Sequence, residues 1–125
     1  LQRVIDTVPS PNNGIGFCMG TIGTMAGADT VDAIRRIGGQ GKVFFAHFRN
    51  PRGQVPKFEE VFPDEGDIDM VAAVAAWRDV GFDGVIRIDH CPGVVGDNAR
   101  ADRSFAFQVG YLRGLMHSLV TGGPQ

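Results

Sequence analysis

Four side chains that could bind a metal ion or move a proton follow short apolar segments of this chain: Cys18, His47, Asp89 and His90. A cysteine thiolate is a soft ligand, a carboxylate is hard and an imidazole is intermediate. Such a mixed set suits a divalent transition ion such as Mn²⁺, Fe²⁺, Co²⁺ or Zn²⁺. Cys18, His47 and Asp89 would supply one ligand each. Three ligands do not complete a coordination shell, so we expect a fourth from chain outside this sequence, from substrate or from water.

Each of these residues taken alone also has a structural interpretation. Cys18 could be a small buried apolar residue, and His47 could be a hydrogen-bonded core histidine. Asp89 could cap a turn or pair with Arg87. Their shared position at the ends of apolar segments favours the metal site. We interpret Cys91 as a bystander, and a disulfide between Cys18 and Cys91 is the less favoured alternative.

The elements that must position these side chains can be predicted from hydrophobic periodicity and turn residues. Helices are predicted at residues 1–8 (the end of a helix), 30–37, 67–80 and 103–120, and strands at 15–19, 42–48 and 84–89. Asp29 is available to cap the helix that follows it, and Gly38 and Gly39 to end that helix. Gly122, Gly123 and Pro124 are expected to end the last helix.

Strand–helix alternation repeated three times predicts an α/β fold with parallel strands. Three strands are few for an independent sheet, so we interpret the chain as about three βα units of a (β/α)₈ TIM barrel, which typically needs about 250 residues. An open doubly wound sheet is the alternative, but no Gly-x-Gly-x-x-Gly follows a strand. The candidate ligands then lie at the carboxyl ends of barrel strands, where barrel active sites are built.

Alternation along each strand agrees with this placement. Side chains two residues apart point to the same face of a strand. One face of the second strand is predicted to carry Val43, Phe45 and His47, and one face of the third to carry Val85, Arg87 and Asp89.

The segment 49–66 is predicted to be a long polar loop. Arg49 and Asn50 begin it, directly after the strand that ends near His47. Arginine binds anions well because its guanidinium presents paired donors. We therefore interpret Arg49 and Asn50 as candidate substrate-binding residues for an anionic substrate, with a solvated loop as the alternative.

Composition excludes several classes of partner. The chain has 125 residues, 43% hydrophobic and 21% charged, with a formal net charge of −2. The absence of a basic block argues against nucleic acid, and no apolar run approaches the roughly 20 residues of a membrane span. Two cysteines make no disulfide framework, which predicts a reducing, cytoplasmic setting.

Several blocks of the sequence resemble the mannonate dehydratase family, in that family's order and over nearly the whole chain. These blocks are Gly16-Phe17-Cys18-Met19-Gly20, Val43-Phe44-Phe45-Ala46-His47-Phe48-Arg49-Asn50 with Arg52-Gly53, residues 58–70, Gly81 through His90, and Gly110-Tyr111-Leu112-Arg113-Gly114-Leu115. The resemblance implies a xylose-isomerase-like barrel, of which residues 1–125 would be the C-terminal portion. It also implies dehydration of D-mannonate to 2-keto-3-deoxy-D-gluconate, and a homo-oligomer of the full-length protein.

The resemblance assigns roles to individual residues. Cys18, His47 and Asp89 would be ligands of a divalent metal, Mn²⁺ or Fe²⁺ in this family, and His90 would be a catalytic acid or base. A further histidine ligand of the family lies upstream of this chain. A family tyrosine after the Asp-His block has no clear match, and Phe105 falls near its place.

Two other functions remain open at this point. A sugar isomerase or epimerase of the same barrel type could use the same ligands to move a proton without expelling water. A catalytically inactive barrel segment with a binding or assembly role is the alternative that the unmatched tyrosine favours. Product analysis distinguishes an isomerase or epimerase from a dehydratase, and the metal content of the full-length protein distinguishes an inactive segment from an enzyme.

Overall fold

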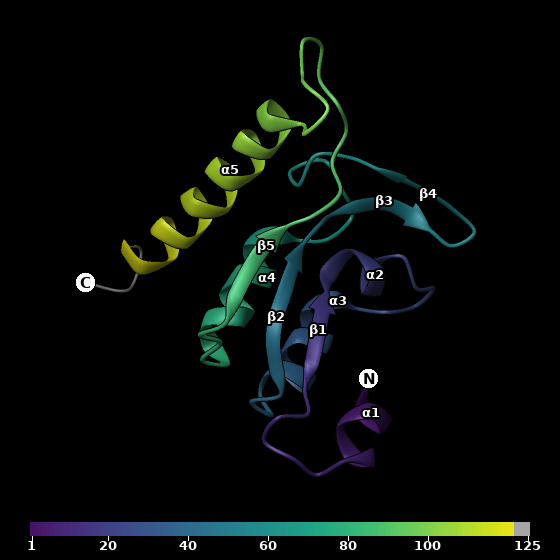
Figure 1. Ribbon diagram of the computed structural model, residues 1–125, viewed down its shortest axis with the longest axis vertical. Helices are drawn as coiled ribbons and strands as arrows, with labels where there is room; N and C mark the ends of the chain where they lie inside the picture. The colour runs from purple at the N-terminus through teal and green to yellow at the C-terminus, as the bar shows by residue number, and fades with distance from the viewer. Residues whose placement is uncertain (122–125) are drawn as a thin grey trace.

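A three-stranded parallel sheet with helices against it forms the body of the molecule (Figure 1). The computed structural model describes residues 1–121. The sheet has the order β1-β2-β5, built from β1 (Ile15–Cys18), β2 (Val43–Phe48) and β5 (Val85–Ile88). The helices are α1 (Gln2–Thr7), α2 (Met19–Gly23), α3 (Thr30–Ala33) with the π-helical turn η1 (Ile34–Gly38), α4 (Met70–Asp79) and α5 (Asp102–Thr121). The expected α/β class with parallel strands is confirmed.

Helices α3 and α4 lie behind the sheet in Figure 1 and cover one of its faces. Their N-termini are capped as residue type predicts: Asp29 accepts from the backbone of Asp32, and Asp69 from that of Ala72. The core between sheet and helices is apolar, and the Phe17 ring packs edge-on against Trp77 at 5.2 Å. Burial of this face fixes which strand residues point away from it, toward the candidate site.

A register irregularity in β2 corrects one expectation about that strand. Ile15 pairs with Val43 and Gly16 pairs with Phe45, so Phe44 has no partner in β1. Val43 is buried in the core, whereas Phe45 and His47 are only partly buried on the other face. The prediction that Val43 shares a face with His47 was therefore wrong, because an extra residue reverses the alternation at that point.

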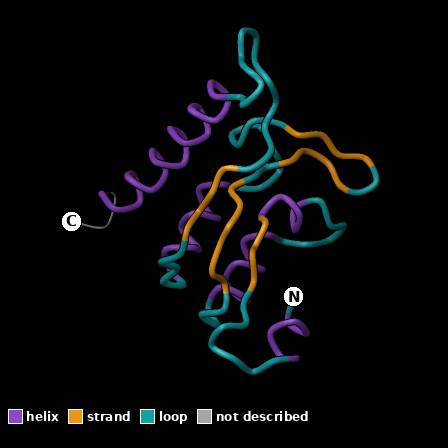
Figure 2. Tube along the Cα trace, in the orientation of Figure 1, coloured by secondary structure: helices purple, strands orange, loops and turns teal. Residues whose placement is uncertain are grey.

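The segment predicted to be a polar loop contains a hairpin. Strands β3 (Pro51–Gln54) and β4 (Lys57–Glu60) pair antiparallel and project from the end of β2 (Figure 2). Gly53 has φ +84°, a conformation that favours glycine, and a Cβ there would meet a backbone oxygen at 2.7 Å. The loop prediction was wrong because most residues of the hairpin are exposed and it has no apolar alternation to reveal it.

The short helix α2 directly after β1 was also not predicted. It begins at Met19, so Cys18 ends the strand and caps the helix at once. The long helix α5 lies beside β5 and agrees with the helix expected at residues 103–120, and the three residues predicted to end it lie outside the described residues. Within residues 1–121, no helix combines the length and the apolar character that a membrane crossing requires.

Candidate metal centre

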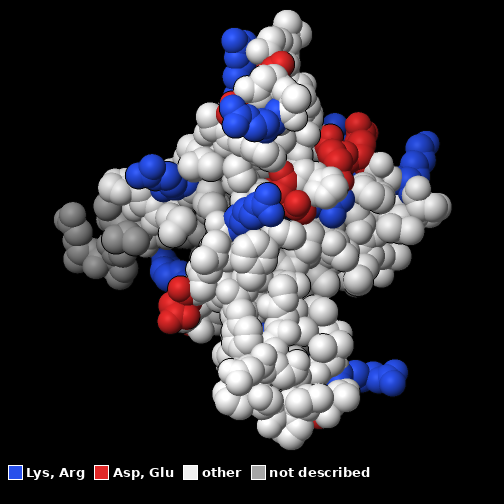
Figure 3. Space-filling view, in the orientation of Figure 1, with Lys and Arg blue, Asp and Glu red and all other residues white. Residues whose placement is uncertain are grey.

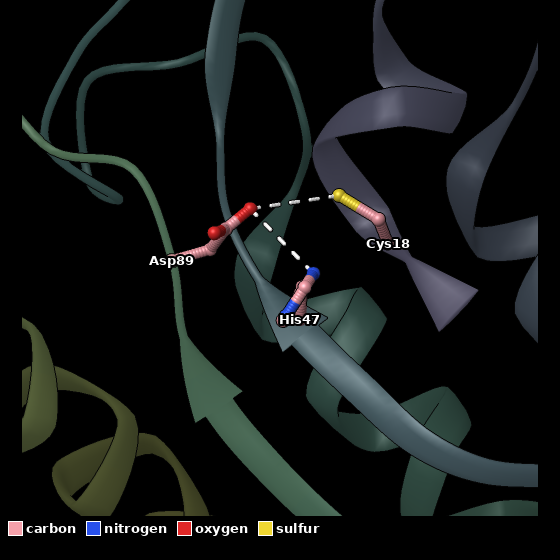
Figure 4. Close-up of side chains that lie close together, drawn as sticks. All are labelled: Cys18, His47 and Asp89. Atoms are coloured by element: carbon pink, nitrogen blue, oxygen red, sulfur yellow. Dashed lines mark hydrogen bonds and ion pairs between the residues drawn. The ribbon is translucent and has the colours of Figure 1, made fainter. Parts of the chain in front are cut away.

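Cys18 is held at the carboxyl end of β1 by its role in the next helix. Its Sγ accepts a hydrogen bond from the backbone N–H of Thr21 at 3.4 Å. Figure 4 shows the sulfur of Cys18 pointing toward Asp89. The chain thereby places a polarisable donor where β1 ends and α2 begins.

His47 and Asp89 reach the same point from the two neighbouring strands. Asp89 Oδ2 lies 3.6 Å from His47 Nδ1 and 3.8 Å from Cys18 Sγ (Figure 4). The side chains of His47 and Asp89 are 31% and 19% exposed, so solvent and small molecules can reach them. Both thiols of the chain are free, and no disulfide joins Cys18 to Cys91.

The three donors are spaced as the ligands of a single ion would be. One ligand atom from each of Cys18, His47 and Asp89 lies within 4.8 Å of the other two. Two ligand atoms that each sit about 2.2 Å from a shared ion, at ordinary coordination angles, are about 3–4 Å apart. The soft, intermediate and hard donor set is the one that the sequence indicated for a divalent transition ion. The residues present therefore fit such an ion.

His90 lies beside this cluster but does not belong to it. Its Nε2 is 3.7 Å from Asp89 Oδ1 and its Nδ1 is 3.8 Å from Glu60 Oε1. The side chain is 61% exposed, and among residues 1–121 the group of close metal donors does not include it. Asp89 and His90 directly follow β5 and present their side chains differently, with Asp89 19% exposed and His90 61% exposed.

Arg49 is buried in an ion pair. Its Nε donates to Glu60 Oε2 at 3.0 Å and its Nη2 donates to Glu60 Oε1, so the pairing is bidentate. The hydrogen bond to Glu60 raises the pKa of the Arg49 guanidinium above its ordinary value, although burial acts to lower it. The guanidinium also lies 5.7 Å from the ring centre of Phe58. These contacts leave Arg49 only 9% exposed.

The remaining guanidinium nitrogen of Arg49 faces the candidate metal centre. Its Nη1 lies 4.0 Å from Cys18 Sγ. A Cβ on Gly20 would lie 2.5 Å from Arg49 Cγ, so the glycine at the start of α2 makes room for this approach.

Asn50 is tied into the protein by its amide. Its Nδ2 donates to Pro63 O at 2.6 Å and to Ile68 O at 3.1 Å, and its Oδ1 accepts from Ile68 N at 2.9 Å. The residue is 3% exposed. These bonds fasten the segment after the hairpin to the end of β2. Substrate binding by Arg49 and Asn50 stays a prediction, and the contacts of both residues support a structural role beside it.

Glu60 is the residue near this site that sequence reasoning missed. It stands at the end of the unpredicted strand β4, and nothing distinguishes it in sequence from its neighbour Glu59. The only signal was the Gly53-Gln54-Val55-Pro56 stretch, whose glycine and proline indicate a turn and so a returning strand. In Figure 3, acidic and basic side chains meet near the carboxyl ends of the three strands, whereas the surface below them in that view is almost free of charge.

Comparisons with known proteins identify the family to which the chain belongs. The model of the D-mannonate dehydratase family matches residues 1–122. Mannonate dehydratase 2 of Halalkalibacterium halodurans is 34% identical over 95% of the chain, which covers 36% of that protein. The mannonate dehydratase of Brachyspira hyodysenteriae is 42% identical over 72% of the chain and 26% of its own length. The chain therefore spans about a third of the length of the curated relatives it matches.

Solved structures give the same result at the level of the fold. The mannonate dehydratase of Streptococcus suis serotype 2 superposes with a TM-score of 0.83 over 91% of this chain and 34% of its own, at 27% identity. A xylose isomerase domain protein from Planctomyces limnophilus superposes with a TM-score of 0.71 over 89% of this chain and 38% of its own. At 20% identity, the second similarity concerns the fold alone.

Proposed function

Because this chain belongs to the D-mannonate dehydratase family, we propose that the full-length protein is a metal-dependent sugar-acid dehydratase that converts D-mannonate into 2-keto-3-deoxy-D-gluconate and water. Residues 1–125 would be the C-terminal portion of its single TIM-barrel domain. The observation that carries the proposal is the convergence of Cys18, His47 and Asp89 at adjacent strand ends, within 4.8 Å of one another. A barrel active site lies at this end of the strands.

Cys18, His47 and Asp89 would hold one divalent ion, Mn²⁺ or Fe²⁺, through Sγ, a ring nitrogen and a carboxylate oxygen. When bound, the ion would supply a Lewis acid that makes the proton on C2 of the sugar acid more acidic. This chain would contribute metal ligands whose orientation is fixed by neighbouring groups. Cys18 is fixed by its bond to the α2 backbone, and the Phe45 ring packs edge-on against His47 at 5.0 Å.

The dehydration itself begins with two proton movements. One group removes the proton from C2, and another gives a proton to the hydroxyl that leaves C3 as water. The resulting enol then takes a proton at C3 and loses the proton of its C2 hydroxyl, which gives the 2-keto product, so no oxidant or reductant is needed. His90 is the group in this chain suited to one of the first two steps, because an imidazole gives and takes protons near neutral pH. Its exposed ring lies next to Asp89 without joining the metal donors.

Product analysis of the full-length protein tests this proposal. Incubation with D-mannonate and Mn²⁺ should yield 2-keto-3-deoxy-D-gluconate, which periodate–thiobarbiturate detection or mass spectrometry identifies through the loss of one water. A product with the mass of the substrate would instead identify an isomerase or epimerase. A metal-free protein without turnover would support the inactive-segment alternative.

A further inference from the structure

The hairpin β3–β4 brings a carboxylate to the edge of the candidate metal centre. Glu60 is the last residue of β4. Its side chain is only 28% exposed, whereas the other three residues of this strand are exposed. Its two oxygens are the acceptors for the guanidinium of Arg49, and Oε1 also lies 3.8 Å from His90 Nδ1. One carboxylate thus connects a buried arginine to the candidate acid or base.

The ring of His90 lies between two carboxylates. Glu60 Oε1 is 3.8 Å from Nδ1 and Asp89 Oδ1 is 3.7 Å from Nε2. Among residues 1–121, these are the acidic groups within ion-pair distance of the imidazole. A carboxylate close to one ring nitrogen of a histidine favours the ring orientation that turns this nitrogen toward it. Because Asp89 belongs to the candidate ligand set, Glu60 is the group free to orient the ring.

Arg49 makes Glu60 a rigid partner. A bidentate guanidinium–carboxylate pair is geometrically specific, and burial of Arg49 restricts its movement further. The pair is held from three sides, by the packing of Gly20, by the Phe58 ring and by the hairpin itself. Neutralising Arg49 would not by itself require Glu60 Oε1 to lie beside the His90 ring.

We propose that Glu60 is a positioning residue for His90, with Arg49 as the clamp that holds Glu60 in place. This inference rests on the proposed function, since it gives His90 the role of acid or base in the dehydration. The hairpin β3–β4 would then be part of the catalytic apparatus rather than a surface excursion. Neither Glu60 nor Arg49 needs to touch the substrate for this role.

A double-mutant cycle in the full-length, metal-loaded enzyme tests the inference. The variants are Glu60→Gln, His90→Asn and the double variant, with Glu59→Gln as the matched control, because Glu59 is exposed on the same strand. Glu60→Gln should lower kcat about tenfold with KM nearly unchanged, the usual size of a lost supporting contact. The double variant should be no slower than His90→Asn alone, because Glu60 would act only through that ring. Glu59→Gln should leave kcat unchanged.

Two results would overturn the inference. One is additive losses in the double variant, which would mean that Glu60 acts independently of His90. The other is a Glu60→Gln enzyme with the kcat of the wild type. If Glu60→Gln does not fold, as judged by its Tm, Arg49→Lys replaces it in the cycle, since lysine keeps the charge but not the bidentate geometry. The same non-additivity is expected for that variant.

The cycle also distinguishes this inference from the proposed function beneath it. If His90→Asn retains the full kcat on D-mannonate, the assigned role of His90 is wrong and the positioning role of Glu60 is overturned with it. If His90→Asn is impaired and Glu60→Gln is not, only the positioning role is overturned.

Discussion

Cys18 Sγ lies 3.8 Å from Asp89 Oδ2, although the two residues are 71 positions apart in the chain. Cys18 is the last residue of β1 and Asp89 directly follows β5, two strands that are not neighbours but flank β2 on either side. Parallel pairing aligns the carboxyl ends of all three strands, with Cys18 opposite His47 and Asp89 just beyond the last paired residue of β5. The candidate metal centre is therefore a direct product of strand order and register.

Asp89→Asn and His90→Asn should separate metal binding from proton transfer. Asp89→Asn removes the only anionic oxygen donor of the cluster, so the full-length protein should lose most of its bound metal. His90→Asn should keep metal near one equivalent and lower turnover about 100-fold or more, the usual effect of losing general acid–base catalysis. Elemental analysis after gel filtration, together with steady-state kinetics, measures both. The opposite pattern would reverse the two assignments.

Cys18→Ser and Cys18→Ala should separate the two roles of Cys18. Serine can still accept the hydrogen bond from Thr21 N, so Cys18→Ser should unfold at the wild-type temperature, whereas Cys18→Ala should lose about 1 kcal/mol or less with its cap. Both variants remove the thiolate and should bind Co²⁺ without the sulfur-to-metal charge-transfer absorption of the wild type. A Cys18→Ser protein that retains this absorption would exclude Cys18 as a ligand.

Asn50→Asp should destabilise the full-length protein by about 3 kcal/mol, because a buried carboxylate would then face two backbone carbonyls that now accept from the amide. Denaturant unfolding measures the loss. Asn12→Asp at an exposed position is the matched control and should change the free energy of unfolding by less than about 0.5 kcal/mol. Equal stability of the two variants would contradict the anchoring role of Asn50.

Asp97 should titrate far below an ordinary aspartate. The hydroxyl of Ser104 donates to its Oδ2 at 2.6 Å, and this bond, with backbone donors, lowers the pKa of Asp97 from 3.8 to about 2. Because the pKa of Asp97 is depressed in the folded state, its carboxylate stabilises the protein at pH values above the ordinary pKa of an aspartate. This stabilisation is lost as pH falls from about 4 toward 2. The advantage of the wild type over Asp97→Asn should therefore shrink in that window.

A carboxyl NMR titration measures the pKa of Asp97 directly. In Ser104→Ala the midpoint should rise toward the ordinary value, because the largest cause of the depression is then gone. An unchanged midpoint would show that the backbone donors alone hold the pKa down.

How far the sequence predicts this molecule differs from element to element. The strands that end near Cys18, His47 and Asp89 have strong apolar character and clear turn residues, so their order and their shared edge could be predicted. The hairpin β3–β4 could not, because its strands are exposed and polar and their pairing depends on a turn rather than on burial. Glu60 was missed with it, since a carboxylate on an unpredicted strand has no assigned direction.

Two further features of the structure could not be predicted from the sequence. The extra residue Phe44 reverses alternation in β2, and such bulges have no fixed signature in residue type. The residue type of Arg49 predicted that it binds an anionic group, and in the structure this group is the carboxylate of Glu60 in the same chain. Periodicity predicts faces and ends of elements, whereas the pairing of one charged side chain with another depends on the folded arrangement.

The proposed site requires that Cys18, His47 and Asp89 bind one divalent ion together. An anomalous difference map from crystals of the full-length protein grown with Mn²⁺, measured at the Mn edge, locates that ion. We expect a single strong peak about 2.0–2.5 Å from Cys18 Sγ, a His47 ring nitrogen and an Asp89 carboxylate oxygen. A peak bound elsewhere in the protein, or an ordered cluster of these three side chains with no peak between them, would contradict it.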